Sequence, residues 1–197
     1  MPNSFSEWIQ IMPSVGAVIL TAVAVKWLDD CIDEDNLTNS MRGGAAYSLT
    51  AILVASVLDL PLTIALFSAC FMIGMFSSMT IKLPSGLPGW LESSLLFMFA
   101  SVYSGLRTAI WAVLVIYSVQ ILDDLLDYNA DHQRCIFNLA RAIGIEQSMI
   151  LFLFCFYLSV AIEPMLSVLV LSSALFVANV LFDQKIGGKL DARVEHG

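Results

Sequence analysis

The chain has 197 residues, of which 58% are hydrophobic and only 13% are charged, and its formal net charge is −8. A soluble domain carries about 25% charged residues, so this composition excludes an ordinary soluble protein and favours a single helical membrane domain over 1–197. The sequence holds no basic cluster with interleaved aromatic residues, which excludes nucleic acid as a partner and leaves membrane lipid as the expected surrounding.

Long apolar runs follow one another along the chain. A spanning helix needs about 20 mostly apolar residues, although runs of roughly 17 also suffice. Such runs occur at about 9–28, 44–59, 61–79, 89–105, 107–123, 146–163 and 164–183. Asp59-Leu60-Pro61 and Glu163-Pro164 interrupt two longer apolar stretches, and because proline ends the preceding helix, each predicts a tight turn between antiparallel helices. The sequence therefore predicts an all-α, polytopic bundle of about seven transmembrane helices.

The basic residues predict the orientation of this bundle. If the helices alternate in direction, eight of the nine Lys and Arg residues fall on one side, and only Arg107 falls on the other. Basic residues gather on the cytoplasmic side, so we expect the N-terminus outside and the polar tail 184–197 in the cytoplasm of a multi-pass protein of the cell membrane. The longer predicted loops, 30–43, 80–88 and 124–145, lie on that cytoplasmic side, where a site is expected.

Two aspartate clusters stand at the predicted cytoplasmic ends of the first and fifth apolar runs. The first cluster contains Asp29, Asp30 and Asp33, and the second contains Asp123, Asp124, Asp127 and Asp131. Asp30 and Asp33 share one helical face, as do Asp124, Asp127 and Asp131, because residues three or four apart are neighbours on a helix surface. Tyr117 and Gln120 continue the second face deeper into the membrane.

Carboxylates packed this closely repel one another and are costly to bury, by about 2.5–3.5 kcal/mol each at the bilayer centre. Acidic side chains at helix C-termini also oppose the macrodipole, so ordinary capping at a wet interface explains them poorly. A hard divalent cation such as Mg²⁺ would offset the repulsion, because it takes carboxylate oxygens together with substrate phosphates. Four predicted crossings separate Asp30 from Asp124, so we expect both helix ends to meet across one central cavity that opens to the cytoplasmic side.

The second cluster resembles a known motif. Its pattern Asp123-Asp124-x-x-Asp127-x-x-x-Asp131 is similar to the NDxxDxxxD motif of UbiA-type intramembrane prenyltransferases, with Asp in place of Asn. The first cluster resembles a shortened copy, since position 37 is Leu. Ile81-Lys82-Leu83-Pro84 is similar to a lysine-containing loop of that family, and the stretch 138–147 resembles the one that follows an aspartate motif. The helix order matches over most of the chain, without counterparts of the family's first and last helices.

The resemblance implies a Mg²⁺-dependent prenyltransferase that ionises an allylic prenyl diphosphate and transfers the prenyl group to a lipophilic acceptor. The implied catalytic residues are Asp30, Asp33, Asp124 and Asp127, and the implied metal ligands are Asp29, Asp30, Asp33, Asp123, Asp124, Asp127 and Asp131. The candidate substrate-binding residues are Lys26, Lys82, Tyr117, Gln120, Arg134 and Arg141. Lys26 lies one turn before Asp30 and is placed to pair with it or to reach a phosphate, whereas Tyr117 and Gln120 are candidates for lining a prenyl tunnel.

Other functions stay open at this point. The same ionised chain would close on itself in a membrane terpene cyclase, and no short motif separates transfer from cyclisation. Both clusters also read as DDxxD, the pattern of soluble isoprenyl diphosphate synthases, but the composition argues against that soluble fold. A cation transporter would hold its carboxylates near the bilayer midplane on broken helices, rather than at helix ends. The shortened first cluster also fits an inactive assembly subunit within a homo- or hetero-oligomer.

Overall fold

The computed structural model describes residues 5–33, 41–74, 80, 82–83, 85–128 and 138–178, with side chains described from residue 11 to 28 in the first range and from 44 onward in the second. The elements are α1 (Phe5–Asp33), α2 (Met41–Leu58), α3 (Leu60–Gly74), α4 (Gly89–Ser104), α5 (Leu106–Leu126), α7 (Leu139–Ile143), α8 (Ile145–Ile162) and a final helix, Pro164–Ala178. Over these residues the chain forms no strand, only an isolated bridge between Lys82 and Pro88. The predicted all-α class is confirmed.

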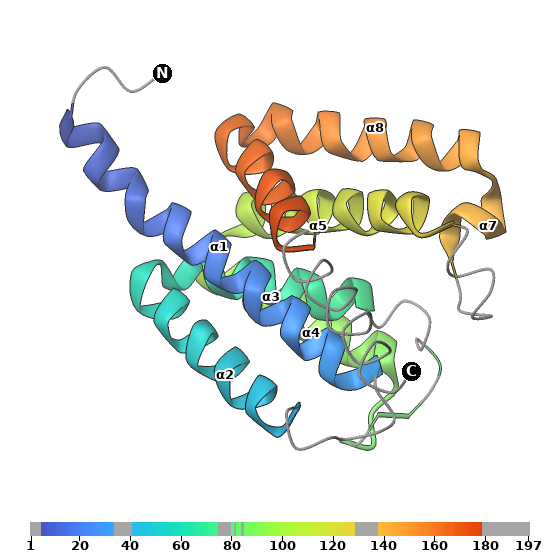
Figure 1. Ribbon diagram of the computed structural model, residues 1–197, viewed down its shortest axis with the longest axis horizontal. Coiled ribbons are helices and arrows are strands. Elements are labelled where there is room, and N and C mark those ends of the chain that lie inside the picture. Colours follow the sequence, from blue (N-terminus) through green and yellow to red (C-terminus); the bar gives the residue numbers. More distant parts are fainter. Residues whose placement is uncertain are drawn as a thin grey trace, which may run out of the picture.

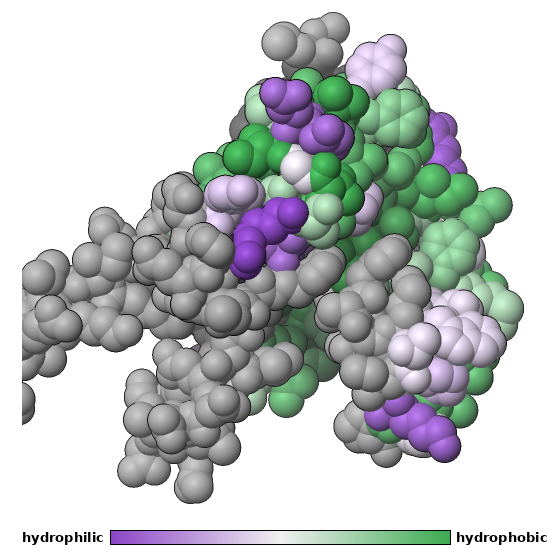
Figure 2. Space-filling view, turned by 90° about the vertical axis from the view of Figure 1, so that its right-hand side faces the viewer, coloured by the Kyte–Doolittle hydropathy of each residue, from purple (hydrophilic) through white to green (hydrophobic). Residues whose placement is uncertain are grey.

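Within the described parts of the chain, three helical segments are long and apolar enough to cross a membrane, namely Ile11–Leu28, Leu106–Leu126 and Ile145–Ile162. Only 22%, 39% and 17% of these segments, respectively, are buried inside the protein. Monomeric soluble proteins rarely expose apolar surface on this scale, and a membrane protein presents it to lipid. Figure 2 shows a face of the molecule on which hydrophobic side chains cover most of the coloured surface. These features agree with the predicted membrane protein.

Single residues connect three pairs of the long apolar helices, and Gly144 likewise separates the short α7 from α8. Asp59 lies between α2 and α3, Gly105 between α4 and α5, and Glu163 between α8 and the final helix, so the tight turns predicted at 59–61 and 163–164 are confirmed. The Asp59 carboxylate accepts the N–H of Leu62 at 3.1 Å, which caps the N-terminus of α3. The same carboxylate accepts the hydroxyl of Ser14 at 2.7 Å, which attaches this turn to α1.

Arg107 stabilises the turn between α8 and the final helix. Its guanidinium donates a 2.7 Å hydrogen bond to the Ile162 carbonyl and lies 3.3 Å from the Glu163 carboxylate. A cation at a helix C-terminus interacts favourably with the macrodipole, although an ion pair this exposed contributes little by itself. Arg107, which is the one basic residue predicted to lie on the outer side of the membrane, therefore has a local structural role.

The helices pack in an order that places α3 at the centre. α1 packs against α2 and α3, α3 also packs against α4 and α5, and α5 packs against α7 and α8. Figure 1 shows α8 lying along α5, with the final helix crossing between α8 and α1. The core combines α1, α3, α5 and the final helix through the buried side chains of Val18, Leu66, Trp111 and Val170. Trp111 is fully buried, and its indole N–H donates to the Ser167 hydroxyl at 2.8 Å.

Candidate functional site

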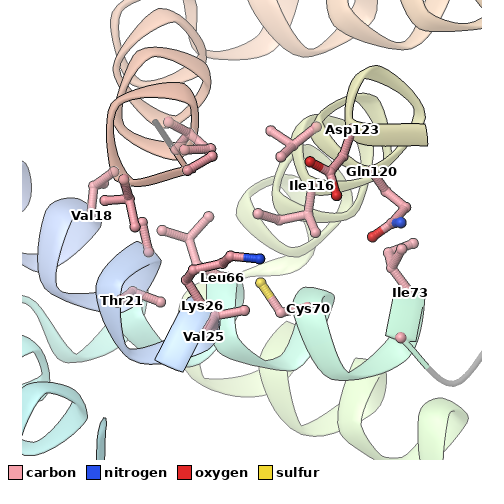
Figure 3. A pocket seen from close by; sticks show the side chains of 17 residues that line it. Val18, Thr21, Val25, Lys26, Leu66, Cys70, Ile73, Ile116, Gln120 and Asp123 are labelled. Carbon is pink, nitrogen blue, oxygen red and sulfur yellow. The ribbon is translucent and has the colours of Figure 1, made fainter. Parts of the chain in front are cut away.

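A pocket of about 220 Å³ lies between α1, α3, α5 and the final helix (Figure 3). Most of its wall is apolar, with aliphatic side chains from all four helices. Its volume is below the range of about 300–1,000 Å³ that is usual for small-molecule sites, so it suits a slender ligand or part of a larger one. The pocket therefore has the shape and lining for an apolar chain of limited size.

The charged residues of the pocket lie at one end. The lining runs from Val18 to Lys26 on α1 and from Ile116 to Asp123 on α5, so the charged residues come last on both helices. Figure 3 shows the Lys26 side chain extending from α1 toward α5, which presents Gln120 and Asp123 to the same space. An apolar body with a charged end is the arrangement that binds an amphiphile.

Both aspartate clusters belong to the helices that form this charged end. Lys26 lies one turn before Asp30 on α1, and Asp123 is the first residue of the second cluster on α5. The side chains of Asp29, Asp30 and Asp33, and the whole of Asp131 and Arg134, lie outside the described residues. The structure thus brings α1 and α5 together at one pocket.

Asp124 occupies a different environment from Asp123. It is 9% exposed, and its Oδ2 accepts the N–H of Leu139 at 2.8 Å while its Oδ1 accepts the Gln120 amide at 3.1 Å. Its main-chain oxygen accepts the Asn138 amide at 2.7 Å. The Asn138 side chain also accepts the N–H of Arg141 at 3.2 Å, which caps the N-terminus of α7. Asp124 therefore anchors the start of α7 to the end of α5.

This geometry differs from the aspartate stripe expected on α5. We predicted that Asp124, Asp127 and Asp131 face the cavity together with Tyr117 and Gln120. Among the described residues the pocket is instead lined by Asp123 and Gln120. The physical reason is that Asp123 and Asp124, being adjacent, point in different directions, and the segment that begins at Asn138 covers the Asp124 side. The spacing of residues along a helix shows which of them share a face, but it does not show which other element packs against that face.

Three of the other predicted substrate-binding residues, Tyr117, Lys82 and Arg141, are described and lie apart from the pocket lining. Tyr117 is within electrostatic reach of Cys155 on α8 and of Asp124, which places it on the α8 side of α5. Lys82 is exposed in the segment before α4, and Arg141 is exposed on α7. Asp127 follows the last residue of α5, and its N–H donates to the Asp123 carbonyl at 2.9 Å. Of the six predicted substrate-binding residues, Lys26 and Gln120 line the pocket.

Sequence reasoning missed the apolar walls of the pocket and the structural role of Asn138. Cys70 and Ile73 of α3 and Val177 of the final helix line the pocket, but nothing in an apolar helix marks them as lining residues. Asn138 did carry a signal, because Asn before a short helical run is a favoured N-cap. That signal predicts the cap of α7, although not the bond to Asp124.

The described residues do not by themselves complete a metal site. Within the parts of the chain that the structure describes, no three His, Cys, Asp or Glu side chains gather closely enough to hold an ion. Asp123 is the described aspartate that lines the pocket, while both carboxylate oxygens of Asp124 accept hydrogen bonds from the protein. A Mg²⁺ site at the charged end would therefore need Asp123 together with carboxylates that lie outside the described residues.

The fold and the pocket define a class of protein. Over the described residues the chain is all-helical, three of its helices are long and apolar enough to span a membrane, and a small amphiphilic pocket is lined by α1, α3, α5 and the final helix. Comparison with protein-family models, with curated proteins and with solved structures found no match for this chain. Its function is accordingly inferred from its own residues and from the pocket.

Proposed function

We propose that this chain is a Mg²⁺-dependent intramembrane prenyltransferase, which ionises an allylic prenyl diphosphate and transfers the prenyl group to a lipophilic acceptor. The observation that carries the proposal is the pocket, which is apolar along its length and charged at the end where Lys26 and Asp123 lie. An allylic prenyl diphosphate has the matching form, with an apolar chain and one charged head. The aspartate clusters on the same two helices supply the carboxylates expected near a diphosphate.

The proposed roles follow from the chemistry of the residues. The aliphatic walls hold the prenyl chain and exclude water from the reacting carbon. The Lys26 ammonium attracts the phosphate oxygens, whereas Asp123 and the first cluster repel a bare diphosphate and favour one that arrives with a cation. Mg²⁺, held by these carboxylates, would neutralise the charge that builds up on the diphosphate.

The reaction balances without a nucleophilic side chain. The allylic C–O bond breaks with its electron pair leaving on the diphosphate, and the electron pair of the acceptor then forms the new bond to the allylic carbon. The acceptor loses one proton in this step, and a carboxylate at the charged end is placed to take it. Cyclisation differs only in that a double bond of the prenyl chain itself supplies the electron pair.

The proposal includes the multi-pass topology. A helix lies in each of the seven apolar ranges, and the single-residue connections at 59, 105 and 163 alternate with longer ones. We place the longer connections, both aspartate clusters and the C-terminus in the cytoplasm, and the N-terminus outside.

Thiol labelling tests this orientation. Cys31 and Cys135 fall on the proposed cytoplasmic side, so a membrane-impermeant maleimide should label the chain in inverted vesicles and not in right-side-out vesicles. A Leu106→Cys variant adds a thiol beside the Gly105 connection, at a position that is 57% exposed. It should add labelling only in right-side-out vesicles, and the opposite pattern for either group would contradict the orientation.

Diphosphate release tests the proposed activity. The purified chain, in liposomes with Mg²⁺, should release diphosphate from allylic prenyl diphosphates, because ionisation separates the head from the chain. Release should require Mg²⁺ and should rise when a lipophilic hydroquinone or phenolic acceptor is added. Product analysis then separates transfer from cyclisation. Absence of release with every chain length, with and without acceptors, would overturn the enzymatic proposal.

A further inference from the structure

The apolar end of the pocket is closed by the packed core. Val18, Leu66 and Val170 line the pocket, and they are only 1%, 2% and 5% exposed. All three also belong to the hydrophobic core cluster, which continues beyond them through Leu62 and Trp111, residues that do not line the pocket. Because protein interiors are packed as densely as organic crystals, a ligand chain cannot extend past these side chains without displacing them.

The distance between the two ends of the pocket follows from helix geometry. From Val18 to Lys26, α1 advances eight residues (26 − 18), or about 12 Å at 1.5 Å per residue. From Leu66 to Gly74, α3 advances by the same amount, and from Ile116 to Asp123, α5 advances slightly less. The usable length between the charged end and the closed end is therefore about 12 Å.

Bond lengths convert this distance into a chain length. Three backbone bonds of an extended peptide span about 3.5 Å, so the four chain bonds of one isoprene unit span roughly 5 Å. A space of about 12 Å thus holds about two isoprene units. The small volume, about 220 Å³, is in keeping with a short chain.

We infer that the pocket selects a short allylic diphosphate of about two isoprene units, and that Leu66, with Val18 and Val170, sets the limit. This inference rests on the proposed function and adds the substrate class to it. Leu66 is a specificity-determining residue in this scheme, because its side chain meets the far end of the prenyl chain. It takes no part in breaking the C–O bond, which lies at the opposite end of the pocket.

The test compares allylic diphosphates from one to four isoprene units on the full chain in Mg²⁺-containing liposomes. The rate of diphosphate release should be highest with two units and should fall by about tenfold or more with three or four, because hydrophobic pockets discriminate by about that factor per added group. The shift of the thermal unfolding midpoint on adding each compound gives an independent measure of binding.

A matched pair of variants tests which residue limits the length of the prenyl chain. Leu66→Ala shortens the side chain at the closed end, so it should raise the rate with three units relative to two by about tenfold. Leu62→Ala removes the same atoms one turn earlier on α3, in the core and away from the pocket lining. It should destabilise the protein to a similar degree and leave the preference for chain length unchanged.

The outcomes separate this inference from the proposed function. Release at equal rates with two, three and four units would overturn the length limit and leave the prenyltransferase proposal standing. A preference that shifts equally in Leu62→Ala and Leu66→Ala would overturn the role of Leu66. Failure of every compound to be cleaved or to raise the unfolding midpoint would overturn the proposed function, and the length limit with it.

Discussion

Asp123→Asn is expected to lower the rate of diphosphate release by about 100- to 1,000-fold, the usual loss when one electrostatic group that stabilises a transition state is removed. Asp123 supplies the carboxylate at the charged end of the pocket, and Asn keeps its shape without its charge. Its side chain is exposed, and exposed substitutions usually change the free energy of unfolding by less than about 0.5 kcal/mol. Activity should therefore fall while the thermal unfolding midpoint stays close to that of the unaltered chain.

Glu146→Gln is a suitable control for Asp123→Asn. Glu146 is an exposed acidic residue in the first turn of α8, outside the pocket lining, so its substitution removes the same unit of charge elsewhere. Release should be unchanged in this variant. Full activity of Asp123→Asn would contradict the placement of the diphosphate at this end of the pocket, and equal losses in both variants would point to net charge rather than to the site.

Asp124→Ala is expected to lower the free energy of unfolding by about 2–4 kcal/mol. A hydrogen bond to a charged acceptor contributes about 1.5–3 kcal/mol, and the second bond contributes less because its donor, Gln120, is exposed. The substitution removes the carboxylate that accepts the N–H of Leu139 and the amide of Gln120, and this carboxylate belongs to a residue that is only 9% exposed. Diphosphate release should also fall, because α7 is then detached from the end of α5 beside Asp123. Denaturant unfolding in detergent micelles measures the first effect.

Two further variants show whether the lost stability comes from the hydrogen bonds between Asp124 and the start of α7. Asp124→Asn keeps one acceptor oxygen and should cost less than Asp124→Ala. Asn138→Ala removes the bond to the Asp124 carbonyl and the cap of α7, so its cost combined with Asp124→Ala should be less than the sum of the two single costs. Unchanged stability of Asp124→Ala together with lost release would contradict the anchoring role and favour a direct role in metal binding.

Asp123 and Asp124 are adjacent in sequence, but we expect their substitution to affect different properties of the protein. Substitution of Asp123 should change activity and leave stability nearly unchanged, whereas substitution of Asp124 should change stability first. The aspartate motif in the sequence predicts that both residues are metal ligands. The structure distinguishes them, because one lines the pocket and the other is hydrogen-bonded to the segment that begins α7.

The sequence by itself determined the positions of the seven long apolar helices and of the tight turns, but not the short α7, which lies in the predicted loop 124–145. Runs of apolar residues predict helices because lipid leaves backbone groups no other partners, and this holds whatever the neighbouring helices are. Asp59 before Leu60-Pro61, and Glu163 before Pro164, end their helices through local backbone constraints. The two aspartate clusters were equally visible, because charges are rare in such a chain.

Only the tertiary structure decided which side chains share a pocket. The helices are apolar on nearly every side, so their sequences do not mark the face that meets a neighbouring helix. The choice of Asp123 rather than Asp124 for the pocket depended on α7, which is hydrogen-bonded to one side of α5, and on α1 and α3, which line the pocket on the other side. The closed end of the pocket at Leu66 likewise exists only because four helices, distant in sequence, pack there. The sequence alone identified the charged residues, but the packing between helices determines which other residues surround them.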